Sequence, residues 1–267
     1  YGLQQGEIKE RFEKLIKYSD PQDNLQTLFV WPEGVFSGYS FSEILWLKDS
    51  FSKNFSNNHI ILFGINKLDK NQKGFYNSII IVNNNLEILQ EYKKQKLVPF
   101  GEFLPFENVL KKLGLKKITE GHGSFLKGGK QANLTIGELN ILPLICYEII
   151  FTNLTQQSDQ LTNLIVNVSE DGWFGNTIGP HQHFVKAIFR AIEQDLFLVR
   201  SANKGISAII NNKGRIIKSL NINETGNIEL EIPLIKSKNR NKNDLIFFAL
   251  LFTYILFFYF YEKNNGQ

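Results

Sequence analysis

A chain of 267 residues with 43% hydrophobic and 21% charged residues has a globular composition, which excludes the disordered, collagenous and low-complexity classes. A single cysteine excludes an intrachain disulfide framework and a cysteine-rich zinc site. The formal net charge of +4 is too small to indicate nucleic acid, so no such partner is expected. The chain contains no Met and begins at Tyr1, so we expect a processed protein or part of a longer one.

Short apolar runs alternate with polar stretches of helical periodicity over residues 1–235. The apolar runs are rich in Ile, Val, Leu and Phe, which is typical of buried strands. In chain order we expect a strand at 1–5, a helix at 8–18, a strand at 27–30, a helix at 42–55, strands at 60–65, 78–82, 139–145 and 164–168, a helix at 181–194, and strands at 197–201, 207–210 and 228–232. Residues 83–85, three Asn in a row, predict a hairpin turn. The pattern predicts one α/β domain in which helices cover packed sheets.

The C-terminal end predicts a membrane segment. Residues 245–261 contain no charge, glycine or proline, and as a helix they would extend roughly 26 Å, at the short end of what crosses a hydrocarbon core. The segment has no polar face, which favours a transmembrane helix over a surface anchor or a buried core helix. A tail follows at 262–267, and a basic linker precedes at 236–244, with Lys236, Lys238, Arg240 and Lys242. By the positive-inside rule this linker alone would place the preceding domain in the cytoplasm.

Three segments bear residues that could do chemistry. Glu33 follows Trp31 and Pro32, and because proline ends the strand ladder it stands at the carboxyl end of a strand, where open α/β sheets place ligand groups. The alternative interpretation is that Glu33 is an ordinary loop carboxylate without a role in a site. Cys146 ends another strand, where an elbow before a helix exposes sulfur and lowers its pKa, and a buried structural cysteine is the alternative.

The remaining segment holds several lysines. Lys93, Lys94 and Lys96 precede an apolar turn, and Glu102 follows that turn closely. Each lysine alone is expected to be a solvated surface charge, but a packed turn can hold one of them beside a buried site. A thiolate nucleophile, a carboxylate that takes its proton and an ammonium that stabilises an oxyanion together form a chemically sensible set.

These residues resemble the nitrilase, or carbon–nitrogen hydrolase, superfamily, which uses Glu, Lys and Cys in this chain order. The match is closer to one branch, the catalytic domain of bacterial apolipoprotein N-acyltransferases. It rests on Trp31-Pro32-Glu33, on residues 92–102 (YKKQKLVPFGE), on Cys146-Tyr147-Glu148, and on motifs between 167 and 207 that include DGWFG. The resemblance selects Lys94 as the catalytic lysine. Two positions depart from the branch, Glu170 where Asn is frequent and Lys204 where Thr is common.

The resemblance implies a four-layer α-β-β-α sandwich over residues 1–235, followed by one transmembrane helix. It implies a catalytic triad of Glu33, Lys94 and Cys146, with Glu102 orienting Lys94 and with Tyr147, Glu148 and Trp173 around the pocket. It implies N-acyl transfer from a phospholipid, through a cysteine thioester, to the N-terminal amine of a diacylglyceryl-cysteine apolipoprotein. It implies no cofactor, and a bacterial inner-membrane protein that is multi-pass at full length, with the catalytic domain on the periplasmic side.

Two other functions stay open. An amidase of the same superfamily would use the same triad on a small amide, with water as the second nucleophile. A membrane-anchored remnant without activity would follow if the chain has lost the membrane helices that usually precede this domain. His181 and His183 are two residues apart on one expected helix, so their rings diverge, and we expect a role at the helix start or in a pocket rather than a metal site.

Overall fold

The computed structural model describes residues 2–71, 74–106, 124–131, 133–156, 159–235 and 244–265. The chain divides into two compact units, Tyr1–Ser237 and Lys238–Gln267. The helices of the first unit are α1 (Gly2–Ser19), η1 (Phe41–Leu47), α2 (Lys48–Asn54), η2 (Cys146–Ile150), α4 (Thr152–Thr155), η3 (Asp171–Phe174) and α5 (Gly179–Gln194). Its strands are β1 (Thr27–Val30), β2 (His59–Leu68), β3 (Phe75–Val82), β4 (Ile88–Lys93), β5 (Leu134–Ile136), β6 (Leu139–Ile145), β7 (Leu164–Glu170), β8 (Phe197–Asn203), β9 (Ser207–Ile210) and β10 (Ile216–Leu220).

The strands form two sheets. The four-stranded sheet has the order β1-β2-β3-β4, and the six-stranded sheet has the order β10-β9-β8-β7-β6-β5. The strands that lead to Glu33 and Cys146 run parallel to a neighbour, β1 to β2 in the first sheet and β6 to β7 in the second, whereas β4, which leads to Lys94, pairs antiparallel with β3. The predicted hairpin turn at 83–85 is confirmed, because β3 and β4 pair antiparallel across it.

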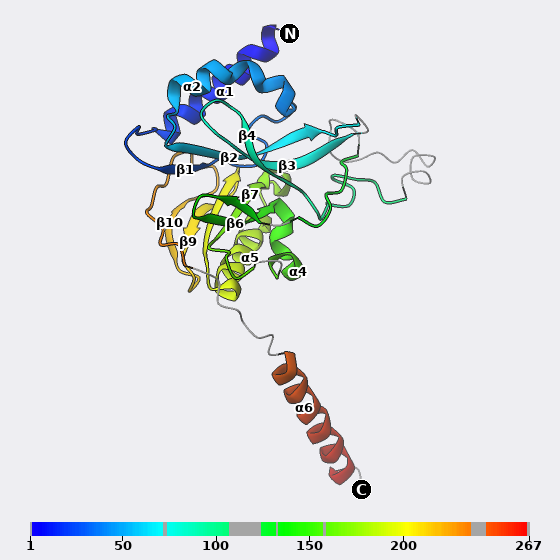
Figure 1. Ribbon diagram of the computed structural model, residues 1–267. Helices are drawn as coiled ribbons and strands as arrows, with labels where there is room; N and C mark the ends of the chain where they lie inside the picture. The colour runs from blue at the N-terminus through cyan, green and yellow to red at the C-terminus, as the bar shows by residue number, and fades with distance from the viewer. Residues whose placement is uncertain are drawn as a thin grey trace. The chain divides into compact units, whose positions relative to one another are not determined.

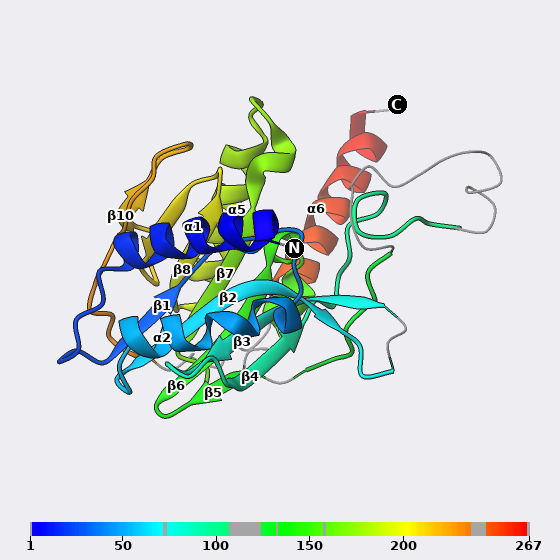
Figure 2. The same cartoon turned by 90° about the horizontal axis from the view of Figure 1, so that it is seen from above.

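Successive side chains along a strand point to opposite faces of its sheet, and together they fill three separate hydrophobic cores. These cores separate the helix layers and the sheet layers of the fold. In β2, Ile61 and Phe63 pack under α1 and α2, whereas Leu62 points into the space between the sheets. In β6, Ile145 also faces that space, whereas Leu144 packs under α5. Helices therefore cover the outer face of each sheet while the inner faces meet, as Figures 1 and 2 show. The predicted α-β-β-α order is confirmed.

Four details of the predicted secondary structure are wrong. Residues 2–5 belong to α1 rather than to a strand, since nothing in them interrupts the helix that follows, and Tyr1 lies outside the described residues. Residues 228–232 form no strand: Ile228, Leu230 and Ile232 pack against the core between the sheets, so the alternation marks an extended segment without a ladder. The helix expected at 42–55 is a 3₁₀ turn followed by a short α-helix. Strands β4, β5 and β10 were not predicted, because their sequences are short or largely polar.

The described residues of the second unit form the helix α6 (Asp244–Asn265). Its window Ile246–Lys263 has a mean hydropathy of 1.5 and none of it is buried, so α6 is long and apolar enough to cross a membrane. The lysines and arginine of the predicted basic linker lie outside the described residues.

Candidate active site

Glu33 lies just beyond the end of β1, and its carboxylate is oriented by two donors. Asn77 Nδ2 donates to Oε1 at 2.7 Å, and the backbone N–H of Glu170 donates to Oε2 at 2.9 Å. The approach of this turn to β2 requires glycine at position 64, because a Cβ there would lie 2.9 Å from the Glu33 Cα. Glu33 is thereby held between the two sheets, with only 12% of its side chain exposed.

Lys94 follows β4 directly and is almost fully buried, with 1% of its side chain exposed. Its Nζ donates to Glu102 Oε1 at 2.7 Å and lies 3.8 Å from Glu33 Oε1. Burial disfavours the ammonium, but the charges of the two carboxylates outweigh burial and raise the pKa of Lys94 above its ordinary value. Lys94 is therefore a fixed buried cation, and the structure brings it next to Glu33, which precedes it by some sixty residues.

The side chain of Glu102 is held by the turn that follows Lys96. The backbone N–H of Val98 donates to Glu102 Oε2 at 2.9 Å, and Asn77 Nδ2 donates to Oε1 at 2.9 Å. The amide of Asn77 thus bridges both carboxylates that flank Lys94. Asn77 is not among the residues predicted for the site, although a lone amide in the largely apolar β3 was a signal for a buried polar contact.

Cys146 begins η2 directly after β6, and its backbone has a φ of +48°. This left-handed conformation costs a residue with a Cβ of order 1–2 kcal/mol, so the surrounding contacts must hold it. Burial and the charge of Glu33 raise the pKa of the Cys146 thiol to about 12, against the smaller effects of Lys94 and a hydrogen bond with Ser169. The expectation that the elbow exposes the sulfur and lowers its pKa is therefore wrong, because Cys146 is buried and desolvation outweighs any field at the start of η2. The thiol needs a base at the moment of attack.

Glu148 is fully buried and connects the Cys146 and Lys94 segments. Its carboxylate accepts from the backbone N–H groups of Gln95 at 2.7 Å, Lys96 at 3.0 Å and Ile145 at 2.9 Å, and from the Tyr92 hydroxyl. Burial raises the pKa of Glu148 and these backbone donors oppose that rise. Glu148 therefore connects the segment that follows β4 with the end of β6 through hydrogen bonds.

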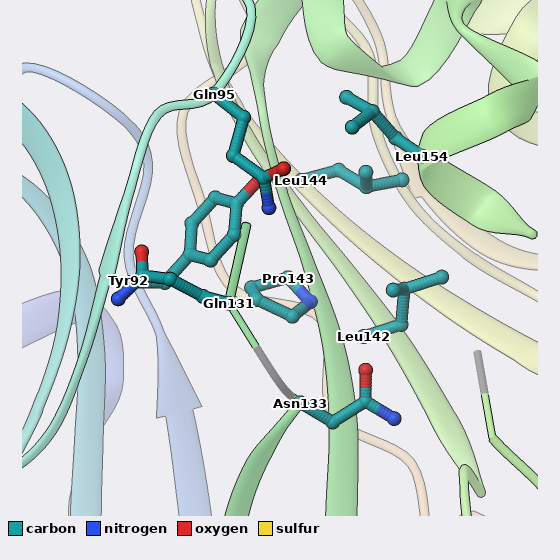
Figure 3. A pocket seen from close by; sticks show the side chains of 8 residues that line it. All are labelled: Tyr92, Gln95, Gln131, Asn133, Leu142, Pro143, Leu144 and Leu154. Atoms are coloured by element: carbon teal, nitrogen blue, oxygen red, sulfur yellow. The ribbon is translucent and has the colours of Figure 1, made fainter. Parts of the chain in front are cut away.

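The two aromatic candidates are exposed rather than enclosed. The Tyr147 residue is 37% exposed and its ring centroid lies 5.8 Å from that of Phe151, while Trp173 in η3 is 63% exposed. A separate crevice, shown in Figure 3, is lined by Tyr92, Gln95, Gln131, Asn133, Leu142, Pro143, Leu144 and Leu154. Glu33, Lys94 and Cys146 are not among the residues that line it.

The two departures from the family motifs are neighbours in space. Glu170 accepts from Gly172 N at 2.9 Å and from Asn203 Nδ2 at 2.6 Å. Burial raises the pKa of Glu170, and these hydrogen bonds oppose the rise, with a smaller opposing effect from the charge of Lys204. A Cβ on Gly172 would lie 2.6 Å from Glu170 Oε1 and 3.0 Å from Lys204 Cδ, so both side chains approach that glycine. Among the described residues, no group of three or more His, Cys, Asp and Glu is arranged to hold a metal ion.

Comparisons with known proteins identify the family and the relatives of this chain. Residues 4–239 match the carbon–nitrogen hydrolase family model. The apolipoprotein N-acyltransferase of Rhizobium leguminosarum bv. trifolii is 37% identical over 210 residues, which are 77% of this chain and 39% of that protein. The apolipoprotein N-acyltransferase of Rickettsia prowazekii is 36% identical over 230 residues, 84% of this chain and 46% of that protein. The chain spans less than half the length of the curated relatives that it matches.

A solved structure supports the fold independently. XC1258 of Xanthomonas campestris, described as a CN-hydrolase superfamily protein, superposes with a TM-score of 0.58 at 15% identity over 82% of each chain. At this identity the likeness concerns the fold alone. The chain belongs to the carbon–nitrogen hydrolase family, in which it is similar to apolipoprotein N-acyltransferases.

Proposed function

We propose that this chain carries the catalytic domain of an apolipoprotein N-acyltransferase. The observation that supports this most directly is the buried set of a carboxylate, an ammonium and a thiol, formed by Glu33, Lys94 and Cys146. A thiol with a raised pKa is inert by itself, and a base beside it makes attack possible in the substrate complex.

In the first half-reaction, Glu33 accepts the Cys146 proton while the sulfur attacks the carbonyl carbon of a phospholipid acyl ester. The carbon–sulfur bond forms, the carbonyl oxygen gains negative charge, and Lys94 with the Tyr147 backbone N–H stabilises that charge. The carbon–oxygen bond to glycerol then breaks, and the proton held by Glu33 passes to the departing lysophospholipid. An acyl thioester on Cys146 remains.

In the second half-reaction, the free α-amine of a lipidated N-terminal cysteine attacks the thioester. Glu33 takes a proton from the amine, the carbon–nitrogen bond forms and the carbon–sulfur bond breaks, and Glu33 passes that proton to the departing Cys146 sulfur, which leaves an amide and the free thiol. Glu102 holds Lys94 in place through both steps, because its Oε1 accepts from Nζ. Trp173 and Tyr147 contribute exposed aromatic surface, which suits acyl chains.

The apolar helix α6 favours acyl transfer over a soluble amidase reaction. Donor and acceptor of the proposed reaction both reside in a bilayer, so anchoring raises their effective concentration at the site. We place the chain in a bacterial inner membrane with the catalytic domain on the periplasmic side, as the resemblance implies, in full-length relatives as part of a multi-pass protein. The basic linker favours the opposite side, but large domains translocate largely regardless of charge. A small-amide hydrolase has no use for such a helix.

Intact mass measurement tests the proposal. The purified chain is incubated with phosphatidylethanolamine vesicles, and one acyl adduct per chain is expected in the native protein and none in Cys146→Ala. Addition of a peptide with an N-terminal diacylglyceryl-cysteine then removes the adduct and increases the peptide mass by one acyl group. Absence of the adduct would contradict acyl transfer, and turnover of small amides without it would favour the amidase. Failure of both reactions would indicate a remnant without activity.

A further inference from the structure

The carbonyl oxygen of Cys146 is held by a buried side chain from a distant helix. His183 on α5 is 4% exposed, and its Nε2 lies 3.1 Å from that oxygen. Asn167 Nδ2 lies 3.5 Å from the same oxygen. The nucleophile's left-handed backbone is thus held from two other elements, β7 and α5.

The position of a proton on His183 follows from its partners. A carbonyl oxygen only accepts, so Nε2 must carry a hydrogen and donate to Cys146 O. Nδ1 lies 3.0 Å from Asp171 Oδ1 and 3.1 Å from Arg200 Nη2. Whether Nδ1 donates to the carboxylate or accepts from the guanidinium, the hydrogen on Nε2 and its bond to Cys146 are unchanged.

His183 is in turn held by a buried ion pair. Arg200 Nη2 donates to Asp171 Oδ2 at 2.7 Å, Arg200 Nε donates to the Ile206 carbonyl at 3.2 Å, and another guanidinium nitrogen donates to Asn167 Oδ1. Asn167 and Arg200 face each other in the pairing of β7 with β8. The ring of His183 is therefore oriented by the sheet itself.

Peptide geometry carries this constraint to the next residue. In a trans peptide the C=O and the following N–H lie in one plane and point in opposite directions. The structure contains no cis peptide among its described residues. A donor that fixes the Cys146 C=O therefore also fixes the direction of the Tyr147 N–H, the backbone donor assigned above to the oxyanion.

We propose that His183 is a positioning residue for the oxyanion site, acting through the Cys146–Tyr147 peptide. The proposal rests on the assignment of Cys146 as the nucleophile and applies to any acyl transfer at that sulfur. Asp171 and Arg200 maintain the orientation of His183. His181, two residues earlier on the same helix and exposed, makes a matched control.

The test compares two reactions of the same sulfur in the full chain. With p-nitrophenyl butyrate, the sulfur–carbon bond forms, p-nitrophenolate leaves, the thiol proton passes to Glu33, and the carbonyl oxygen carries charge in the transition state. With iodoacetamide, sulfur displaces iodide and no carbonyl oxygen gains charge. The amide nitrogen of Gln reaches about where Nε2 stands, whereas that of Asn reaches only to Nδ1, so His183→Gln and His183→Asn separate the two ring positions.

We expect His183→Asn to lower the rate constant of acylation by about 100-fold with an unchanged half-saturation concentration of the ester, and to change alkylation by less than about threefold. His183→Gln should recover most of the acylation rate, and His181→Gln should behave as the native chain. Equal loss in both reactions, or no recovery in His183→Gln, would assign His183 a merely structural role and overturn the proposal. If His183→Asn does not fold, His183→Leu and His183→Gln give the same comparison. Absence of ester acylation in the native chain would instead contradict the nucleophile itself.

Discussion

The substitution Glu33→Gln separates two opposite effects of one carboxylate. Burial and the negative charge of Glu33 raise the pKa of Cys146 to about 12, so the thiol is almost entirely protonated at neutral pH. The same carboxylate is the proposed base. Removing the charge should therefore favour the thiolate while removing the group that assists attack.

The two effects have different magnitudes. Loss of a nearby like charge lowers a pKa by about 1 unit, which increases the thiolate fraction about tenfold below the pKa. The intrinsic nucleophilicity of the less basic thiolate falls about threefold, so alkylation by iodoacetamide should be about threefold faster in the variant. Acylation by an ester, which depends on the base, should fall by about 10²- to 10⁴-fold.

Both rates are followed by intact mass between pH 7 and pH 9. Glu138→Gln, which removes an exposed carboxylate in the turn between β5 and β6, is the control for net charge. Gln at position 33 can replace only one of the two acceptor oxygens that bind Asn77 and Glu170, at a cost of about 1 kcal/mol, so thermal unfolding is measured alongside. A variant whose alkylation slows in parallel with its acylation would refute the reasoning.

Three further predictions concern the buried charges and the second unit. Lys94→Met should lower the free energy of unfolding in urea at pH 7 by about 3 kcal/mol, because Glu33 and Glu102 lose their buried cation, and a loss below about 1 kcal/mol would contradict this. Asp171 has its pKa lowered to about 2, because hydrogen bonding to His183 and the charges around it outweigh burial. It should stabilise the fold by about 2 kcal/mol above pH 4 and lose this as pH falls towards 2, a slope that is absent in Asp171→Asn. Leu251→Arg in α6, but not Leu251→Val, should abolish flotation of the chain with lipid vesicles, since a central arginine costs roughly 3 kcal/mol in a membrane helix.

The sequence by itself determined the local features. Strand ends after apolar runs placed Glu33 and Cys146 correctly, because a strand with both faces buried must be apolar and its end is where polar residues become possible. The family motifs selected Lys94 among three neighbouring lysines, a choice that composition and periodicity could not make. The apolar run at the C-terminus was visible for the same reason, since its character depends on composition alone.

Only the tertiary structure decided how distant residues act on one another. The alternation in residues 228–232 showed one buried face but not whether a neighbouring strand was available to pair with it. Asn77 bridges two carboxylates, and His183 reaches the Cys146 carbonyl, through contacts between segments that are far apart in the chain. The sign of the Cys146 pKa shift also depended on them, because desolvation and the field of Glu33 arise only when the two sheets pack together. Local pattern follows from the residue types, whereas burial and electrostatics follow from which residues the fold brings into contact.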